Sequence, residues 1–163
     1  IMQIVKKAIC ILLSVMAVCM LCSCSASDKV FSSKGMSITL TDEFKENKEY
    51  YGMTYYDSEE AQVCVAKEEI AVLEEKGEET DFDLKGYADY LLKSISVTAE
   101  IKTEDGITYF EYSKKPDDIK YNYFVSVYKT EDAFWFIQFS CQSDKINEYR
   151  PLFVKWAKSV FFD

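Results

Sequence analysis

Two long β-like runs near the C-terminus constrain the fold more than any other feature of the sequence. Tyr121 to Thr130 and Phe134 to Cys141 are rich in the aromatic and β-branched residues that strands prefer. Only Glu131-Asp132-Ala133 joins them, and so tight a connection places two strands side by side and antiparallel. The sequence therefore predicts a hairpin here and a sheet built around it.

Further hairpins are predicted upstream of this pair. An Asp-Gly step lies between two alternating runs at Glu104-Asp105-Gly106, which is a strong hairpin signal. Gly35 supplies the permissive backbone of an earlier turn, and Asp57-Ser58-Glu59-Glu60 indicates another. The strands that these turns join are predicted at Val30–Ser32 and Met36–Leu40, at Tyr50–Tyr56 and Ala61–Lys67, and at Val97–Thr103 and Ile107–Ser113.

Two other segments have helical periodicity. Asp83 is a typical N-cap, and the apolar residues from Leu84 to Ile95 recur at the spacing of one helix face. A last helix follows Asp144, and Pro151 lies either in its early turns or at its true start. Its apolar stripe consists of Leu152, Phe153, Trp156 and Val160. Hairpins with two such helices predict an α+β fold, in which two main helices flank an antiparallel sheet of about six to seven strands.

The N-terminal residues have the pattern of an export signal. Lys6-Lys7 precedes an apolar run from Ala8 to Cys22, which is shorter than the roughly 20 residues of a membrane-spanning helix. Leu21-Cys22-Ser23-Cys24 resembles the lipobox of bacterial lipoproteins, in which the cysteine receives a diacylglyceryl group and becomes the first residue after cleavage. The resemblance implies that Cys24 is lipidated. It divides the chain into a signal peptide at residues 1–23, a lipidated tether at 24–29 and a single domain at 30–163.

The N-terminal residues allow two alternative interpretations. An uncleaved signal anchor is disfavoured because the apolar run is short and ends in the lipobox-like sequence. A disulfide or metal pair at Cys22 and Cys24 is disfavoured because the chain has no histidine and a Cys-x-Cys step alone is a poor metal site. We therefore expect a protein held by a lipid on the extracytoplasmic face of the cell membrane.

The charge of the chain excludes one class of partner. The sequence has 19 basic and 28 acidic residues, and the first 23 residues hold two lysines and no acid, which leaves 17 basic against 28 acidic side chains. A formal charge of −11 after cleavage argues against nucleic acid, whose binding requires basic patches. It favours solubility or, alternatively, a cationic partner.

Only Cys64 and Cys141 remain besides Cys24 after cleavage at the lipobox. Each lies in an apolar, strand-like run, which favours two free buried thiols. A disulfide between them stays open at this point, since sequence spacing does not show whether two Cα atoms come within about 7 Å.

The layout of the chain resembles that of PsbP-like bacterial lipoproteins. The resemblance rests on the lipobox, on Phe31 with Gly35 to Leu40, on the mid-chain helix, on the paired aromatic strands and on a closing helix that ends at Ser159 to Phe162. It implies an antiparallel sheet with helices on its faces over residues 29–163. Members of that fold have binding or accessory roles, so the resemblance implies a non-enzymatic protein.

Catalytic and cofactor motifs are sparse. Without histidine, a Ser-His or Cys-His pair cannot form, and catalysis would need carboxylates, lysine or tyrosine. No glycine-rich phosphate loop occurs, and no cofactor or metal is expected. The segment after Asp81 begins like a calcium loop, but Lys85 and Leu92 stand where ligands belong. The acidic stretch from Glu68 to Thr80 is expected to be an exposed strand end or loose helical turn followed by a loop.

The tyrosine-rich run from Tyr50 to Tyr56 is the candidate binding surface. Tyr51, Tyr55 and Tyr56 are its candidate binding residues, unless helices cover both faces of the sheet. The sequence favours a membrane-anchored, non-enzymatic domain that binds a protein, a peptide or an envelope component. The alternatives are a carboxylate-dependent hydrolase acting on cell-envelope or glycan substrates, and a purely structural envelope protein.

Overall fold

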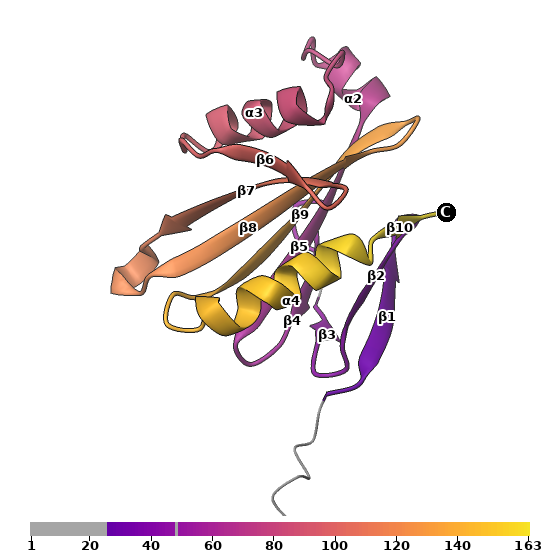
Figure 1. Cartoon of the computed structure of the whole chain (residues 1–163). Helices are drawn as coiled ribbons and strands as arrows, with labels where there is room; N and C mark the ends of the chain where they lie inside the picture. The colour runs from indigo at the N-terminus through magenta and orange to yellow at the C-terminus, as the bar shows by residue number, and fades with distance from the viewer. Residues whose placement is uncertain (1–25, 48) are drawn as a thin grey trace, which may run out of the picture.

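The predicted C-terminal hairpin forms the centre of the larger sheet. In the computed structural model, which describes residues 26–47 and 49–163, β8 (Tyr121–Lys129) and β9 (Ala133–Gln142) pair antiparallel along their whole length. They belong to a seven-stranded sheet of order β3-β4-β5-β9-β8-β7-β6 (Figure 1). The other strands are β3 (Lys45–Glu46), β4 (Thr54–Asp57), β5 (Ala61–Glu69), β6 (Ile101–Glu104) and β7 (Ile107–Lys114), and every neighbouring pair is antiparallel.

The predicted turn residues form the turns of this sheet. Glu104 pairs with Ile107, so Asp105 and Gly106 alone make the β6–β7 turn, and both have the positive φ that such a turn requires. The run from Tyr50 to Tyr56, in contrast, is not one strand. Tyr50 and Met53 exchange backbone hydrogen bonds of 3.0 Å around Tyr51 and Gly52, both at positive φ, so the strand begins only at Thr54.

Three further strands form a second, smaller sheet that the sequence did not predict as a separate unit. β1 (Asp28–Ser33), β2 (Met36–Thr41) and β10 (Phe161–Phe162) follow the order β1-β2-β10. The prediction that the closing helix extends to Phe162 is wrong, because α4 (Ile146–Lys158) ends earlier and Phe161 and Phe162 pair with β2. Pro151 lies inside α4, so the alternative that it marks the start of the helix is also wrong.

The helices pack on both faces of the larger sheet, in agreement with the predicted α+β class. α3 (Leu84–Ser94) and the short α2 (Ile70–Glu75) lie on one face, whereas α4 and the small sheet lie on the other (Figure 1). Asp83 caps α3 as predicted, since its side chain accepts a 2.7 Å hydrogen bond from the backbone N–H of Gly86. A short 3₁₀ turn, η1 (Pro116–Asp118), precedes β8. None of the helices in the described part of the chain is long and apolar enough to cross a bilayer.

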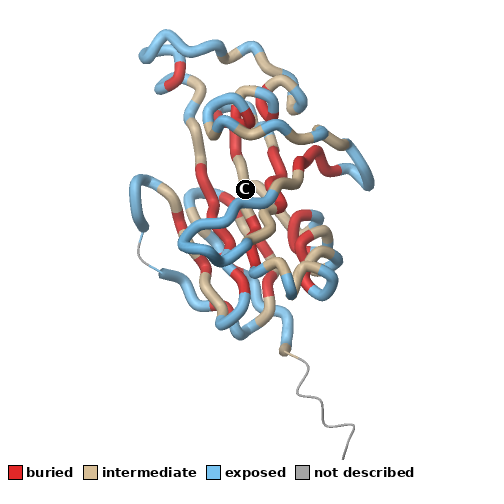
Figure 2. Tube along the Cα trace, turned by 90° about the vertical axis from the view of Figure 1, so that its left-hand side faces the viewer, coloured by how far each residue is buried: buried red, intermediate tan, exposed pale blue. Residues whose placement is uncertain are grey.

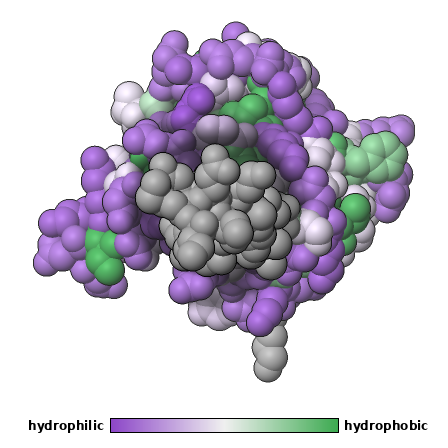
Figure 3. All heavy atoms as spheres, turned by 60° about the horizontal axis from the view of Figure 1, so that its bottom comes forward, coloured by the Kyte–Doolittle hydropathy of each residue, from purple (hydrophilic) through white to green (hydrophobic). Residues whose placement is uncertain are grey.

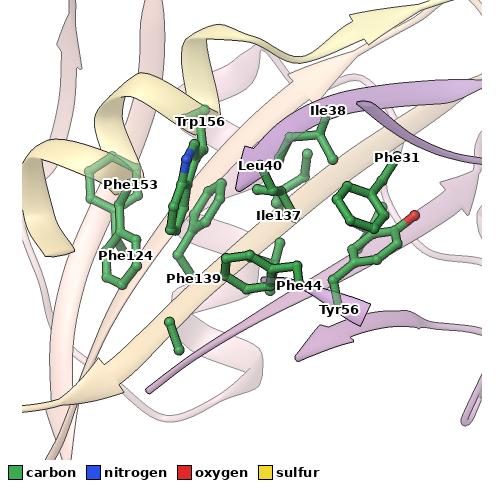
Figure 4. Packing of buried hydrophobic residues seen from close by; sticks show 14 of the residues in the cluster. Phe31, Ile38, Leu40, Phe44, Tyr56, Phe124, Ile137, Phe139, Phe153 and Trp156 are labelled. Atoms are coloured by element: carbon green, nitrogen blue, oxygen red, sulfur yellow. The ribbon is translucent and has the colours of Figure 1, made fainter. Parts of the chain in front are cut away.

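Aromatic rings fill the larger of two buried clusters. Figure 4 shows the rings of Phe139, Phe153 and Trp156 gathered beneath α4, with Phe139 and Phe153 5.5 Å apart. Towards the small sheet, the ring centroids of Phe31 and Tyr56 lie 5.1 Å apart. Buried positions accordingly concentrate along the central strands and the inner sides of the helices, and exposed positions in the loops (Figure 2). This core holds the sheet rigidly in place behind the site described next.

Candidate functional site

Helix α3 covers only part of its face of the seven-stranded sheet. It packs on β6, β7 and β8, and its buried side chains cluster with Phe110 of β7, Val125 of β8 and Phe134 at the start of β9. Beyond the end of α3 at Ser94, the same face of β4, β5, β9 and the start of β8 carries a broad hollow (its volume is about 940 Å³). We term this uncovered part of the sheet the open face.

The strand register determines which side chains the open face presents. In one row across the sheet, Tyr55 pairs with Cys64, and Cys64 pairs with Gln138. In the next row, Ser140 lies between Gln62 on β5 and Tyr123 on β8. Paired residues, and residues two apart along one strand, point to the same face, so the two rows lie together. Other residues that line the hollow are Met53, Tyr121, Phe136 and Gln142.

Two stacked tyrosines orient a glutamine side chain of the open face. The rings of Tyr112 and Tyr123 stack with their centroids 4.7 Å apart, and the Tyr112 hydroxyl donates a 3.0 Å hydrogen bond to Oε1 of Gln138. Burial raises the pKa of Tyr112 to about 12, so the hydroxyl remains a donor at neutral pH. This contact orients the side-chain amide of Gln138, whose NH₂ group can donate to a ligand.

The thiol of Cys64 belongs to the open face but is not an activated nucleophile. The residue is only 4% exposed, and its Sγ lies 3.6 Å from the sulfur of Met53. Burial raises the pKa of the Cys64 thiol to about 11, which keeps the sulfur protonated. The structure therefore favours a packing role for this cysteine rather than covalent catalysis.

Acidic residues line the rim of the hollow beside the β4–β5 turn. Asp57 accepts hydrogen bonds of 2.8 Å from the side-chain amides of Asn47 and Gln62. Glu60 forms a 2.6 Å ion pair with Lys145, and this contact lowers the pKa of the Glu60 carboxyl. Because Glu59 adds a further acid and Lys145 is already paired, the rim disfavours anionic ligands.

A metal site or a carboxylate-dependent hydrolase would place specific requirements on the acidic residues of the rim. Across residues 26–47 and 49–163, no three or more potential ligand residues gather into a group that could hold a metal ion. The contact with Lys145 lowers the pKa of Glu60, so this carboxyl lacks the raised pKa of a glycosidase general acid. Aromatic rings, amides and hydroxyls instead make the open face a surface for stacking and hydrogen bonding.

The three tyrosines predicted as binding residues occupy three different environments. Tyr55 is partly exposed on the open face, and burial beside Cys64 raises its pKa. Tyr51 is 82% exposed in the turn before β4, outside the main hollow. Tyr56 is 0% exposed in the core and so does not belong to an accessible surface, because its position along β4 directs it to the opposite face from Tyr55. The predicted lipidation site, Cys24, lies outside the described residues.

Several residues of the open face were missed by sequence analysis, above all Tyr121, Tyr123 and Gln138. Alternation along β8 does place Tyr121 and Tyr123 on the face shared by Val125. The missing information was where α3 ends, since only the position of that helix decides which part of the face is uncovered.

Comparisons with known proteins agree with this fold. No family model matches the chain, and no curated protein matches it in sequence. Among solved structures, cyanobacterial PsbP from Synechocystis sp. PCC 6803 is similar, with a TM-score of 0.57, 15% identity, and coverage of 85% of this chain and 94% of that one. The Ran-binding protein Mog1p of Saccharomyces cerevisiae is similar with a TM-score of 0.58 and 9% identity over 85% of this chain and 96% of that one.

A protein from Bacteroides thetaiotaomicron VPI-5482 also matches, with a TM-score of 0.58 and 11% identity over 83% of this chain and 48% of that one. At these identities the likeness concerns the fold alone. The fold implied by the sequence resemblance is therefore confirmed: the chain has the PsbP-like α+β fold.

Proposed function

We propose that this protein is a lipid-anchored binding or accessory protein at the extracytoplasmic face of a bacterial cell membrane, and that its open face binds a protein or peptide segment. The observation that carries the proposal is the 940 Å³ hollow on a rigid sheet, lined by tyrosines, glutamines and a protonated cysteine. Ligand sites typically combine such apolar and aromatic walls with a few fixed polar groups.

The acidic rim and the charge of the chain support a neutral or cationic partner. Asp57, Glu59 and Glu60 lie at the hollow, and the chain carries nine more acidic than basic groups. The side of the molecule shown in Figure 3 is mainly hydrophilic, with hydrophobic side chains in separate spots around its described surface. An acidic surface steers cationic partners and repels nucleic acid and anionic lipid headgroups.

The short distance between the proposed anchor and the domain supports a partner close to the membrane. The N–H and hydroxyl of Ser27 bond to the carboxylate of Asp42, so the folded part already begins three residues after Cys24. Three residues span at most about 11 Å when fully extended. The domain would therefore sit beside the bilayer rather than on a long stalk.

Photo-crosslinking in the native envelope tests this proposal. A photoreactive residue replaces Tyr123 on the open face of the full-length protein, and the matched control replaces Val30, which is 62% exposed on the small sheet across the molecule. We expect Tyr123 to capture a partner that Val30 does not capture. Equal capture at both positions, or none at Tyr123, Tyr121 and Tyr55, would contradict the proposal.

Binding of the purified partner then identifies the surface. Gln142→Arg adds a bulky cation to the hollow and should weaken binding at least about tenfold if a cationic segment occupies it. Asn147→Arg, which makes the same charge change on the exposed side of α4, should leave binding unchanged.

A further inference from the structure

Strand β5 extends past its neighbour β4. β4 pairs with β5 only from Gln62 to Val65, whereas β9 pairs with β5 as far as Glu69. On the β4 side, Ala66 to Glu69 have no strand beside them in the described part of the chain. We term these four residues the free edge.

The turn at the start of β5 shows which backbone groups point towards the free edge. The C=O of Ala61 accepts a 2.9 Å hydrogen bond from the N–H of Ser58, and therefore points to the β4 side. Every second residue of a strand directs its N–H and C=O to the same side, so Lys67 shares this direction with Ala61. The backbone of Lys67 consequently lies ready to pair with a strand placed where β4 would continue past Thr54.

A hollow of about 470 Å³ lies beside the free edge. The turn before β4 and helix α2 form its walls, with Tyr51 82% exposed and Val72 40% exposed. Phe136 and Met53 line this hollow and also the larger hollow of the open face. The free edge therefore opens onto the same sheet face as the proposed binding site.

Glu68 gives the position opposite it at the free edge a preference for positive charge. Its side chain lines this hollow and a second one of about 250 Å³ beneath α3, and its Oε2 accepts a 2.7 Å hydrogen bond from the hydroxyl of Tyr87. Three lysines line the hollow: Lys34 pairs with Glu49, Lys67 pairs with Asp132, and Lys76 lies at the end of α2. Glu68 itself forms no ion pair with any residue that the structure describes.

We propose that the free edge receives an extended basic peptide segment of the partner as an added β-strand. The segment pairs with the backbone of Lys67, places an apolar side chain opposite Ala66 beside Phe136, and places a lysine or arginine opposite Glu68. This inference rests on the proposed binding function and names the chemistry of the partner. The edge is only four residues long and carries Lys67 and Glu69, charges that discourage unspecific pairing, so a short segment fits it best.

Peptide binding to the full-length, detergent-solubilised protein tests the charge preference. The probe is the acetylated and amidated peptide Thr-Thr-Lys-Thr-Ile-Thr-Thr, in which lysine and isoleucine point to one face; its counterpart has glutamate in place of lysine. We expect the lysine peptide to bind at least about tenfold more tightly. Glu68→Gln should abolish most of this difference, whereas Glu74→Gln, the same change at an exposed position of α2 outside the hollow, should preserve it.

Two substitutions at Lys67 test strand pairing itself. Lys67→Ala removes the side chain and its ion pair but keeps the backbone N–H, whereas Lys67→Pro also removes the N–H that points to the free edge. We expect the Lys67→Pro variant to bind the lysine peptide at least about tenfold more weakly than the Lys67→Ala variant, at an equal melting temperature. In the wild-type protein, we expect the bound peptide to slow hydrogen exchange of the Lys67 amide proton.

Equal binding by the two variants, or no binding of either peptide at millimolar concentration, overturns the added-strand proposal. If Gln142→Arg still disrupts the crosslinked partner in that case, the binding function stands and only this mode of recognition fails.

Discussion

Cys64 and Cys141 lie on adjacent strands but on opposite faces of the sheet. Cys64 pairs with Gln138 and Cys141 with Ala61, so the two cysteines are three residues apart in register. An odd offset directs their side chains to opposite faces, which prevents a disulfide. The interpretation of both as free buried thiols is confirmed.

The two thiols make stability sensitive to alkaline pH. Burial raises the pKa of each from 9.0 to about 11, so the folded protein keeps both protonated where the unfolded chain begins to ionise. The contribution of the two protonated thiols to the free energy of unfolding is complete below pH 9 and is lost as the pH rises towards 11. We expect the midpoint of urea unfolding to fall between pH 9 and pH 11, and to fall less in the Cys64→Ala variant.

A reductant tests the assignment of free thiols separately. We expect it to leave the melting temperature at pH 7 unchanged, and a melting temperature lowered by the reductant would contradict the assignment.

The N-cap of α3 positions the helix that borders the open face. Asp83→Ala removes the 2.7 Å hydrogen bond to the N–H of Gly86 and should cost about 1 kcal/mol, which lowers the melting temperature by about 3 °C. Asp83→Ser, which can restore a cap, should recover most of the loss. Asp89→Ala, which breaks only the exposed pair with Lys93, should change the melting temperature much less. Equal losses for Asp83→Ala and Asp83→Ser would show that the cap is not the cause.

Helix α4 contains a proline where an ordinary residue would be more stable. Pro151 is the sixth residue of the helix and has no N–H to donate to the C=O of Asn147, one turn earlier. Since Pro151 is exposed, Pro151→Ala creates no cavity and should raise the free energy of unfolding by about 1 kcal/mol or more. Chemical denaturation measures this directly. A decrease would mean that the proline is required for the path of α4.

Local sequence signals predicted the elements that depend on nearby residues. The Asp105-Gly106 turn, the Asp83 cap and the β8–β9 hairpin all follow from a few neighbouring positions. The separate small sheet could not be predicted, because Phe161 pairs with Ser37 across most of the chain. The burial of Tyr56, which was predicted to be a binding residue, also depends on a distant part of the chain. Its ring packs against Phe31 of the small sheet, and the local sequence pattern does not reveal this contact.

The two faces of the larger sheet are covered to different extents. α4 and the small sheet bury one face under a continuous aromatic core, whereas α3 leaves part of the other face uncovered. A surface built on rigid strands keeps its geometry when a ligand binds, which lowers the entropic cost of binding. The position of α3, rather than any single motif, therefore creates the candidate site.

The proposed anchor determines what this surface can reach, and the last prediction tests it. In cells that make the full-length protein, Cys24→Ala should leave the signal peptide attached and the mass without a diacylglyceryl group, because no thiol is present to receive it. Cys22→Ala is the matched control, since it removes a thiol two residues away but keeps Cys24, the proposed lipidation site, and the serine before it. Intact mass spectrometry should find lipid on the wild-type and Cys22→Ala proteins and none on Cys24→Ala. If the wild-type protein carries no lipid, the partner need not lie at the membrane, although the open face and the free edge of β5 remain testable on their own.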